Sequence, residues 1–264
     1  MKLLVCVKQV ADLESRFKPN AAGTWYDEAD VAFRMNEYDE YAVEEAVRLK
    51  EKLGGEPDLT VLSIGPERVG EVIKKALAMG CDRGVHVLDP EAASKDPSQI
   101  ASIIAAFVTA TTVATGKGFD LVFTGMQSQD RGSAQVGLMV AERLGIAALS
   151  TMVAFDFADG VITAKRELEG GIKALARLKP PALLTCQLGL NVPRYPTLPN
   201  IMKAKKKELL VVPVASLLSE EAKATTAKFY APARKGGGIV LEGEVADLVA
   251  KTMAILKEKT GVLR

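Results

Sequence analysis

One loop of the sequence carries residues suited to binding a phosphate. In FTGMQSQDRGSAQVGLMVAERLG (123–145), a strand-like run ends at Thr124, Gly125 permits a tight turn, and small and polar residues lead into a helical pattern. A helix starting there would direct unpaired N–H groups at an anion, so a phosphate between Arg131 and Val136 fits this order. The loop contains neither GxGxxG nor a GxxxxGK motif, which predicts nucleotide binding without hydrolysis. An ordinary polar loop remains the alternative.

Other residue types that commonly carry chemistry are sparse. Cys6, Cys81 and Cys186 are far apart and lie among apolar or small residues, which favours buried, reduced thiols over disulfides or a metal site. The only histidine, His86, lies in a strand-like run, where we expect a structural role. The sequence has no nucleophile–histidine arrangement, acidic metal pair or phosphate-binding lysine motif. We therefore expect no catalytic residue and no metal, and a nucleotide-dependent ligase or hydrolase is the weakest hypothesis.

A second segment, RYPTLPNIMKAKKKE (194–208), predicts a surface for docking another protein. Leu198 precedes a proline and is therefore kept out of the helical region, while Pro199 suits the first turn of a helix that follows. The leucine would be presented at the entrance of that helix, beside a lysine cluster at 203–207. Two alternatives stay open. One is a solvated basic face, and the other is a nucleic-acid patch, which would lack interleaved aromatic residues apart from Tyr195.

Strand-like and helix-like patterns alternate through the first half of the chain. Short apolar runs predict strands at 3–8, 59–65, 84–89 and 119–125. Helical spacing predicts helices after Asn36, from Glu67, at 97–115 and from Ser133. Asn36 is a candidate N-cap with Asp39 three residues on. The predicted fold is α/β, with an open, mostly parallel sheet and helices on both faces, of the adenine-nucleotide-binding, Rossmann-like kind.

The pattern of predicted elements changes in the second half of the chain. From about Ala148, short strand-like pieces alternate with turn residues, and we expect them to extend or flank the sheet. Beyond Pro213 the pattern loosens and ends in a helix at about 244–259. We therefore expect an α/β nucleotide-binding domain at 1–213 and a C-terminal arm and helix at 214–264 that needs a partner surface.

Composition narrows the function classes. The 264 residues are 48% hydrophobic, which is ample for a core, and 34 basic residues against 33 acidic ones argue against nucleic-acid binding. We expect no apolar run that approaches the ~20 residues of a membrane span. The first residues lack the features of a secretory signal. A cytoplasmic protein that is not inserted in a membrane is the expectation.

The segment VPRYPTLPNIMKAKKKEL closely resembles the signature of electron transfer flavoprotein beta subunits, and AVEEAVRLKEK, ALAMGCDRGVHV, GMQSQD and KRELEGG fall where that family has similar stretches. The likeness extends to about Leu210. It implies an electron carrier without a reaction of its own, in a heterodimer with an alpha subunit that packs against the C-terminal arm. FAD held mainly by alpha would accept electrons from acyl-CoA dehydrogenases in fatty acid beta-oxidation and pass them to a membrane-bound flavoprotein-quinone oxidoreductase.

The resemblance also implies an AMP held as a structural group in this chain, largely through backbone atoms. The residues implied for AMP are Cys6, Asn36, Glu37, Tyr38, Asp39, Ile64, Gly125, Met126, Gln127, Ser128, Gln129, Asp130, Arg131, Gly132, Ser133, Ala134, Gln135 and Val136.

In the family, the segment around Leu198 is a recognition loop whose leucine enters an apolar pocket of the dehydrogenase. Glu167 resembles a carboxylate that pairs with an arginine of alpha or of the moving flavin domain, although a solvated surface Glu is an equal alternative. We expect Lys203 and Lys207 to share a helix face and to speed association. The residues implied for partner binding are Tyr195, Leu198, Pro199, Ile201, Met202, Lys203, Lys207 and Glu167.

Two further hypotheses stay open. Some members of the superfamily bind a second FAD in place of AMP and bifurcate electron pairs. NEYDEYA and SAQVG resemble that group, whereas the recognition segment resembles the ordinary dehydrogenase-linked group, and we therefore favour AMP. A nucleotide-sensing regulatory protein that is stable alone is the hypothesis from a different class.

Overall fold

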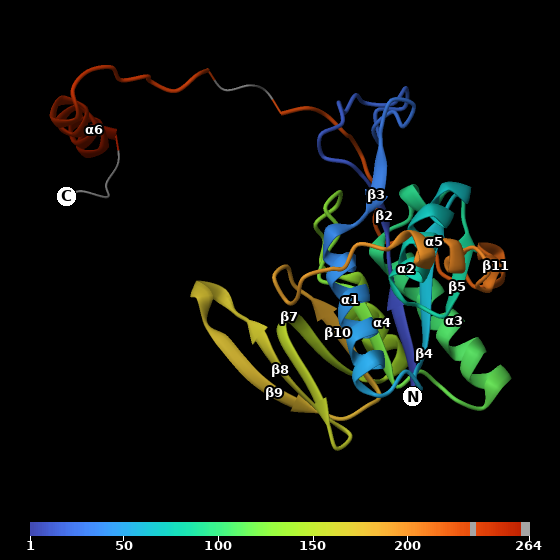
Figure 1. Cartoon of the computed structure of the whole chain (residues 1–264). Helices are drawn as coiled ribbons and strands as arrows, with labels where there is room; N and C mark the ends of the chain where they lie inside the picture. Colours follow the sequence, from blue (N-terminus) through green and yellow to red (C-terminus); the bar gives the residue numbers. More distant parts are fainter. Residues whose placement is uncertain (233–235, 260–264) are drawn as a thin grey trace. The chain divides into compact units, whose positions relative to one another are not determined.

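The computed structural model describes residues 1–232 and 236–259, and its centre is one large sheet (Figure 1). Within the described residues, nine strands pair in the order β11-β5-β4-β1-β6-β10-β7-β8-β9. Their bounds are β1 Lys2–Cys6, β4 Asp58–Gly65, β5 Arg83–Leu88, β6 Leu121–Gly125, β7 Ala147–Ala158, β8 Val161–Glu167, β9 Lys173–Leu178, β10 Ala182–Cys186 and β11 Leu209–Pro213. The pairs from β11 to β7 are parallel, and β7, β8 and β9 pair antiparallel. The predicted mostly parallel α/β fold is confirmed, and the pieces after Ala148 do extend the sheet.

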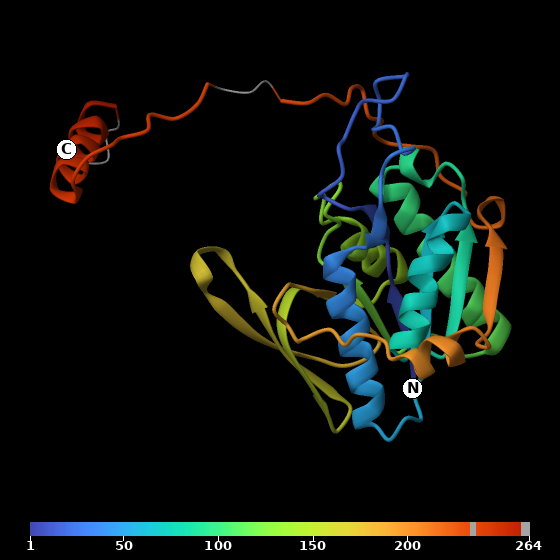
Figure 2. The same cartoon turned by 45° about the horizontal axis from the view of Figure 1, so that its top comes forward.

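Helices cover both faces of the parallel part (Figure 2). The helices α1 (Glu37–Lys52) and α2 (Gly70–Met79) pack on one face, and α3 (Pro97–Thr115) and α4 (Val136–Leu144) pack on the other. Because successive strand residues point to opposite faces, each central strand supplies both cores, which explains why these strands are apolar throughout.

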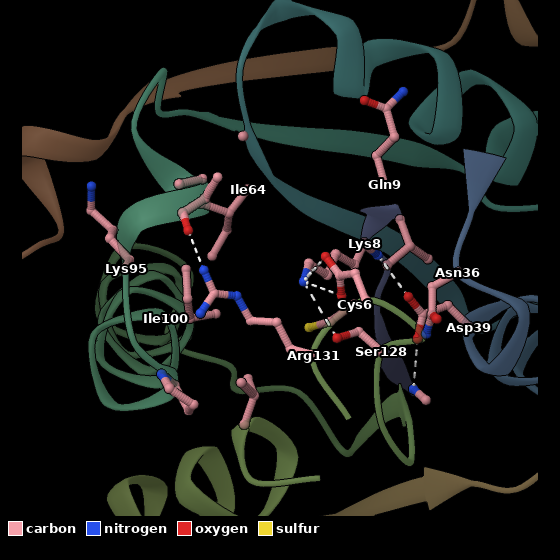
Figure 3. Close-up of a pocket in the computed structure, with 18 of the residues that line it drawn as sticks. Cys6, Lys8, Gln9, Asn36, Asp39, Ile64, Lys95, Ile100, Ser128 and Arg131 are labelled. Carbon is pink, nitrogen blue, oxygen red and sulfur yellow. Dashed lines mark hydrogen bonds and ion pairs between the residues drawn. The ribbon is translucent and has the colours of Figure 1, made fainter. Parts of the chain in front are cut away.

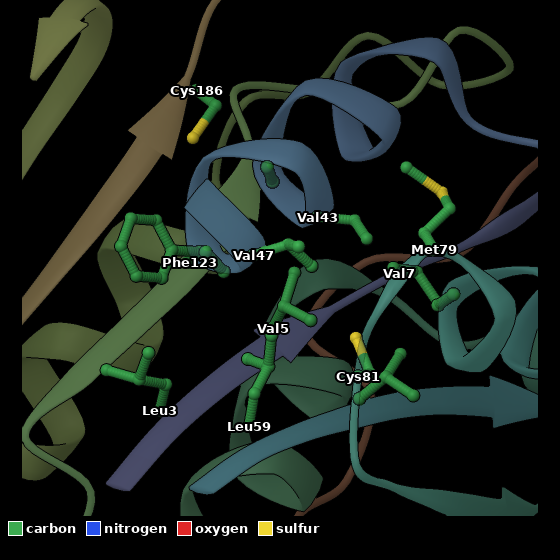
Figure 4. Close-up of a cluster of buried hydrophobic side chains, with 14 of the residues drawn as sticks. Leu3, Val5, Val7, Val43, Val47, Leu59, Met79, Cys81, Phe123 and Cys186 are labelled. Atoms are coloured by element: carbon green, nitrogen blue, oxygen red, sulfur yellow. The ribbon is translucent and has the colours of Figure 1, made fainter. Parts of the chain in front are cut away.

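The core beneath α1 and α2 is the larger of the two (Figure 4). Val5 of β1 and Phe123 of β6 lie in it together with Val43 and Val47 of α1, and all four side chains are buried. This packing fixes α1 across the central strands, so that the start of the helix lies at the carboxyl ends of β1 and β6.

The scarce reactive residues are buried structural groups. The three cysteines are free and buried, as predicted. Burial raises the pKa of both Cys6 and Cys81 to about 12, which keeps them as thiols at neutral pH. The Nε2 atom of the buried His86 lies 2.9 Å from the carbonyl oxygen of Gly65, in agreement with a structural role.

The helix α3 corrects the expectation about membrane spans. By length and composition alone, Pro97–Thr115 could cross a membrane, with a mean hydropathy of 1.4. Half of that stretch is buried inside the protein. Its start is held by Asp96, whose carboxylate accepts a hydrogen bond from the N–H of Gln99 at 2.8 Å. The helix is therefore explained as a core helix of this fold, and its apolar composition reflects packing.

Several boundaries differ from the predicted ones. A two-stranded sheet of β2 (Gln9–Ala11) and β3 (Phe33–Met35), which brackets the loop 12–32, was not predicted because three-residue strands leave almost no periodic pattern. The edge strand β11 was also not predicted. Helix α4 begins at Val136 instead of Ser133, because Ala134 has a left-handed φ of 53°.

The chain divides into two units, and the boundary lies after Phe229, not after Pro213 as predicted. Residues 214–229 belong to the first unit because they pack on it. Leu217 and Leu218 contact the core under α3 and α4, and the backbone N–H groups of Lys223 and Ala224 donate to Asp96 at 2.6 and 2.9 Å. The second unit starts at Tyr230 and contains α6 (Val245–Lys259), close to the predicted helix.

Candidate functional site

A cavity lies at the carboxyl ends of β1, β4 and β6, where open α/β sheets bind their ligands (Figure 3). Ile64 and Ile100 form one side of it, Lys8 and Ser128 lie on the opposite side, and Arg131 reaches between them. The lining comes from six stretches, which are Cys6–Gln9, the Trp25–Tyr26 pair with Glu28, Asn36 and Asp39 at the start of α1, the end of β4 with the turn to Val69, residues 90–104, and the loop 124–137.

Asp39 in the first turn of α1 ties together the strand ends that form the cavity floor. Its carboxylate accepts hydrogen bonds from the backbone N–H of Lys8 at 2.7 Å and of Gly125 at 3.1 Å. Burial raises the pKa of Asp39 to about 7, although these N–H donors favour the ionised form and oppose the rise. A Cβ atom on Gly125 would lie 2.2 Å from Asp39 Oδ1, so only glycine permits this close approach.

Asn36 has a different role from the predicted helix cap. It occupies the N-cap position of α1, but its side chain makes no capping hydrogen bond. The side-chain amide instead donates to the carbonyl of Gln127 at 2.8 Å and accepts from the N–H of Gln129 at 3.0 Å. The start of α1 and the loop after β6 are thereby cross-linked, which fixes the loop over the cavity.

The end of that loop is shaped to receive an anion. Ala134 is left-handed with φ of 53°, Gln135 is right-handed, and α4 then begins at Val136 without a side-chain cap. Such a left-to-right pair turns successive N–H groups into one concavity, and the helix terminus adds positive partial charge. A Cβ on Gly137 would lie 2.8 Å from Thr124 Oγ1, so glycine lets α4 start directly against β6. The predicted order of strand, turn and helix therefore brings the backbone at 134–136, where α4 begins, to the cavity wall.

Charged side chains close the cavity from above. Lys8 Nζ lies 2.7 Å from the Asp130 carboxylate, so the lysine is held within the site. The guanidinium of Arg131 lies 4.5 Å from the centroid of the Trp25 ring and donates a hydrogen bond to the carbonyl of Ala93. Arg131 thus connects the loop 12–32, the loop after β6 and the segment before α3.

The segment before β11 exposes Leu198 at a helix entrance, as predicted, but Leu198 is the first residue of that helix and is not kept out of the helical region. Helix α5 (Leu198–Ala204) begins with Leu198 and Pro199, and the hydroxyl of Thr197 accepts a hydrogen bond from the N–H of Asn200 at 3.4 Å. Leu198 is 78% exposed and Tyr195 is 92% exposed. We call residues 195–204 the docking segment.

Lys207 does not share a helix face with Lys203, because α5 ends at Ala204. Its ammonium donates to the carbonyls of Leu77 at 2.9 Å and Cys81 at 2.5 Å, at the end of α2. The carbonyl of Leu77 is one of the groups that a helix leaves unpaired at its C-terminus, and Cys81 follows directly after the C-cap Gly80, so Lys207 is a structural cap of α2.

Comparison with known proteins gives one consistent result. A family model for the electron transfer flavoprotein domain matches residues 23–217. The electron transfer flavoprotein subunit beta of Methylophilus methylotrophus is 35% identical over 270 residues, covering 99% of this chain and 100% of the relative. The mouse protein of the same name is 39% identical over 95% of this chain and 96% of its own length, and that of Bacillus subtilis is 34% identical over the full length of both. The chain belongs to the family of electron transfer flavoprotein beta subunits.

Membership makes the chain part of a flavoprotein of electron transport. The structure brings most of the residues implied for AMP to the cavity wall. These are Cys6, Asn36, Asp39, Ile64, Gly125, Met126, Gln127, Ser128, Asp130, Arg131, Ser133, Ala134, Gln135 and Val136.

Four of the residues implied for AMP lie outside the lining, which are Glu37, Tyr38, Gln129 and Gly132. Two side-chain hydrogen bonds that involve these residues hold the loop in place. Gln129 Nε2 donates to Glu37 at 2.8 Å, and Gln127 Nε2 donates to the hydroxyl of Tyr38 at 3.0 Å. These residues support the loop, and they do not line the cavity.

Four further residues, Lys8, Trp25, Arg68 and Lys95, also line the cavity. Lys8 is the last residue of a predicted central strand, so its place at the carboxyl edge of the sheet follows from the sequence, although it was not among the residues implied for AMP. The sequence interpretation missed the other three, which come from the loop 12–32 and from short turns whose position depends on tertiary contacts. Among the described residues, no cluster of three or more His, Cys, Asp or Glu side chains is arranged to hold a metal ion.

Glu167 lies at the end of β8, away from the cavity lining. Its carboxylate accepts a hydrogen bond from Gln187 Nε2 at 3.2 Å, and its carbonyl accepts one from the hydroxyl of Thr151 at 2.8 Å. Thr151 is a β-branched residue with φ of 54°, at an irregularity where β7 leaves β10. Strained backbone at a bulge commonly re-aims nearby side chains.

Proposed function

We propose that this chain is the beta half of a heterodimeric electron carrier and that it holds one AMP in the cavity at the strand ends. The observation that carries the proposal is that one cavity is lined both by the left-to-right backbone turn at 134–136, where α4 begins, and by the apolar side chains of Ile64 and Ile100. A phosphate on the N–H groups and an adenine against the apolar side would match both halves of this cavity.

The contacts of Arg131 across the cavity favour a mononucleotide as the ligand rather than a second FAD. Arg131 bridges Trp25 and Ala93 across the site, which limits how far a larger ligand could extend without displacing that contact. The site also offers no phosphate-binding lysine motif, and within the described residues no metal cluster, so the proposed nucleotide is held and not hydrolysed.

The exposed docking segment supports an exchange of electrons with a partner protein. In the proposal, Leu198 enters an apolar pocket of an acyl-CoA dehydrogenase, and FAD carried mainly by the alpha subunit receives the electrons. Burying one leucine contributes roughly 1.5–3 kcal/mol, which suits a partner that must leave after each transfer. The carrier would then meet a membrane-bound flavoprotein-quinone oxidoreductase while remaining in the cytoplasm.

The second unit supports the need for an alpha subunit, a partner that the name of the beta-subunit relatives also implies. Helix α6 has no buried residue, and Val245, Val249 and Met253 on one side of it are 74%, 57% and 41% exposed. An amphipathic helix without a core of its own gains stability by packing on another chain. We propose that α6 packs on alpha and that Glu167 pairs with an arginine of that subunit or of its flavin domain.

Purification with a co-expressed alpha subunit tests this proposal. We expect a stable heterodimer that releases one FAD and one AMP on denaturation, quantified by absorbance and mass spectrometry. Two FAD per heterodimer would overturn the AMP assignment while leaving the electron carrier in place. A stable, nucleotide-responsive monomer that associates with no flavin-carrying chain would overturn the proposal as a whole.

A further inference from the structure

The stretch that leads into the docking segment is held on α1, and Arg194 makes most of the contacts. Residues 187–197 lack helix or strand and connect β10 to α5. Within this stretch, Arg194 Nε and Nη2 donate to the two carboxylate oxygens of Glu44 at 2.8 and 3.1 Å. Its Nη1 and Nη2 also donate to the two oxygens of Glu51 at 2.5 and 2.9 Å. One guanidinium therefore makes paired contacts with two carboxylates, the geometry in which arginine binds most specifically.

The backbone beside Arg194 is held by the same helix. The N–H of Arg194 donates to Glu44 at 3.1 Å, and Arg48 donates to the carbonyl of Val192 at 3.4 Å. Asn191 donates to Glu45 at 2.9 Å and to the carbonyl of Tyr41 at 3.0 Å. Three consecutive turns of α1 thus hold three residues of an otherwise irregular connection, Asn191, Val192 and Arg194.

Because Glu44 is buried, its contact with Arg194 is costly to break. The Glu44 side chain is only 3% exposed, whereas the Glu51 side chain is 57% exposed. Burial alone would raise the pKa of Glu44, but hydrogen bonds from Arg194 and Arg48 outweigh it and hold the pKa below its ordinary value. Removing Arg194 would leave this buried carboxylate with Arg48 as its one remaining arginine partner, which is unfavourable, so residues 191–194 stay on α1.

The residues that follow Arg194 have no such support of their own. Tyr195 and Leu198 project into solvent, and α5, the next element, is seven residues long. The direction in which they project is therefore set by the anchors on either side, Arg194 before them and the capped start of α5 after them. A binding group that is already ordered loses less entropy when its partner binds.

We propose that Arg194, gripped by Glu44 and Glu51, is the positioning residue that presents Tyr195 and Leu198 to the electron donor. It acts through Leu198 and does not itself contact the donor. This inference rests on the proposed function, because it assigns a role within the proposed docking step.

The test is a double-mutant cycle on the heterodimer, with stopped-flow reduction of its FAD by an acyl-CoA dehydrogenase. We expect Arg194→Gln to lower the second-order rate about tenfold, since two side chains must then be ordered during docking. In the Leu198→Ala background the same substitution should cost only about threefold, because Tyr195 is then the one remaining side chain to be ordered. Lys117→Gln removes an exposed positive charge from the turn before β6 and should leave the rate unchanged.

A second, milder variant keeps the test informative if Arg194→Gln does not fold. Glu51→Gln removes only the exposed half of the grip, and we expect a smaller loss of rate with unaltered flavin content. Hydrogen exchange of residues 191–198 should become faster in Arg194→Gln but not in Lys117→Gln, a readout that needs no donor.

The possible results separate this inference from the proposed function. If no acyl-CoA dehydrogenase reduces the wild-type heterodimer, the proposed function fails, and faster exchange alone would still support the anchoring of the segment. If Leu198→Ala slows reduction but Arg194→Gln does not, the positioning role is overturned. Equal losses from Arg194→Gln with and without Leu198 would also overturn it, because the arginine would then act independently of the leucine.

Discussion

Replacing Asp39 by Asn tests whether this one carboxylate holds the strand ends together. The two Asp39 oxygens accept from the N–H groups of Lys8 and Gly125. Asn can offer only one oxygen, and its amide N–H₂ would face the second donor. One buried N–H is left without an acceptor, which costs about 1–3 kcal/mol. For a unit of this size the melting temperature should fall by roughly 2–12 °C.

The pH dependence of that loss gives a sharper test. The pKa of Asp39 is raised to about 7 in the folded protein, above its ordinary value of 3.8. Between these values the unfolded chain releases a proton that the folded chain keeps, so this group stabilises the wild-type protein most at low pH, and the contribution is lost as the pH rises toward 7. Asp39→Asn lacks the titration. Its stability deficit should therefore be largest near pH 4 and should narrow toward pH 8.

Chemical denaturation of both proteins across that pH range measures the difference directly, with the exposed Asp30→Asn as the control for losing one carboxylate. AMP content after purification should fall in parallel, since Lys8 and Gly125 both line the cavity. A deficit that grows with pH would contradict the reasoning, because it would mean that Asp39 is held in its ionised form. Wild-type stability and AMP content at every pH would contradict the assigned contacts themselves.

Four other substitutions probe the remaining parts. Gly125→Ala should destabilise the protein by about 1–3 kcal/mol in denaturant titrations through overpacking, whereas Gly70→Ala, with open space around its Cβ, should not. Leu198→Ala should slow FAD reduction by the donor about 10- to 100-fold in stopped-flow measurements while heterodimer stability stays unchanged. Lys203→Gln should reduce the association rate and its salt dependence, but Lys207→Gln should instead lower thermal stability by about 1 kcal/mol with no change in salt dependence. The reverse assignment of the two lysines would contradict the capping role.

Local sequence patterns predicted the parts of this fold that are periodic or that end in strong stop signals. The buried strands of the parallel sheet and the helix at 97–115 have such patterns, and their existence and type are confirmed. Where a pattern is short or a contact is distant, prediction failed. β11 is an edge strand of five residues whose place depends on pairing with β5, and Lys207 is directed to α2 by a turn that the helical spacing of lysines does not reveal.

The residues of the cavity divide in the same way into those that local sequence patterns predicted and those that depend on distant contacts. The loop 124–137 was recognisable because a strand, a glycine and a helix start follow one another in the chain. The role of Asn36 was not, since its local signal as a helix cap is overridden by hydrogen bonds to residues about ninety positions away. Trp25 lies between two three-residue strands, and only the folded loop 12–32 brings it over Arg131.

Helix α1 connects the two candidate sites. Its first turn carries Asp39, which fixes the cavity floor, and follows Asn36, which fixes the loop over the cavity. Its next turns carry Glu44 and Glu51, which hold Arg194. A rigid helix packed on the sheet transmits the position of one end to the other without any conformational switch. A nucleotide that takes no part in the redox chemistry would still contribute to electron transfer, because filling the cavity stabilises the start of the helix on which the docking segment is mounted.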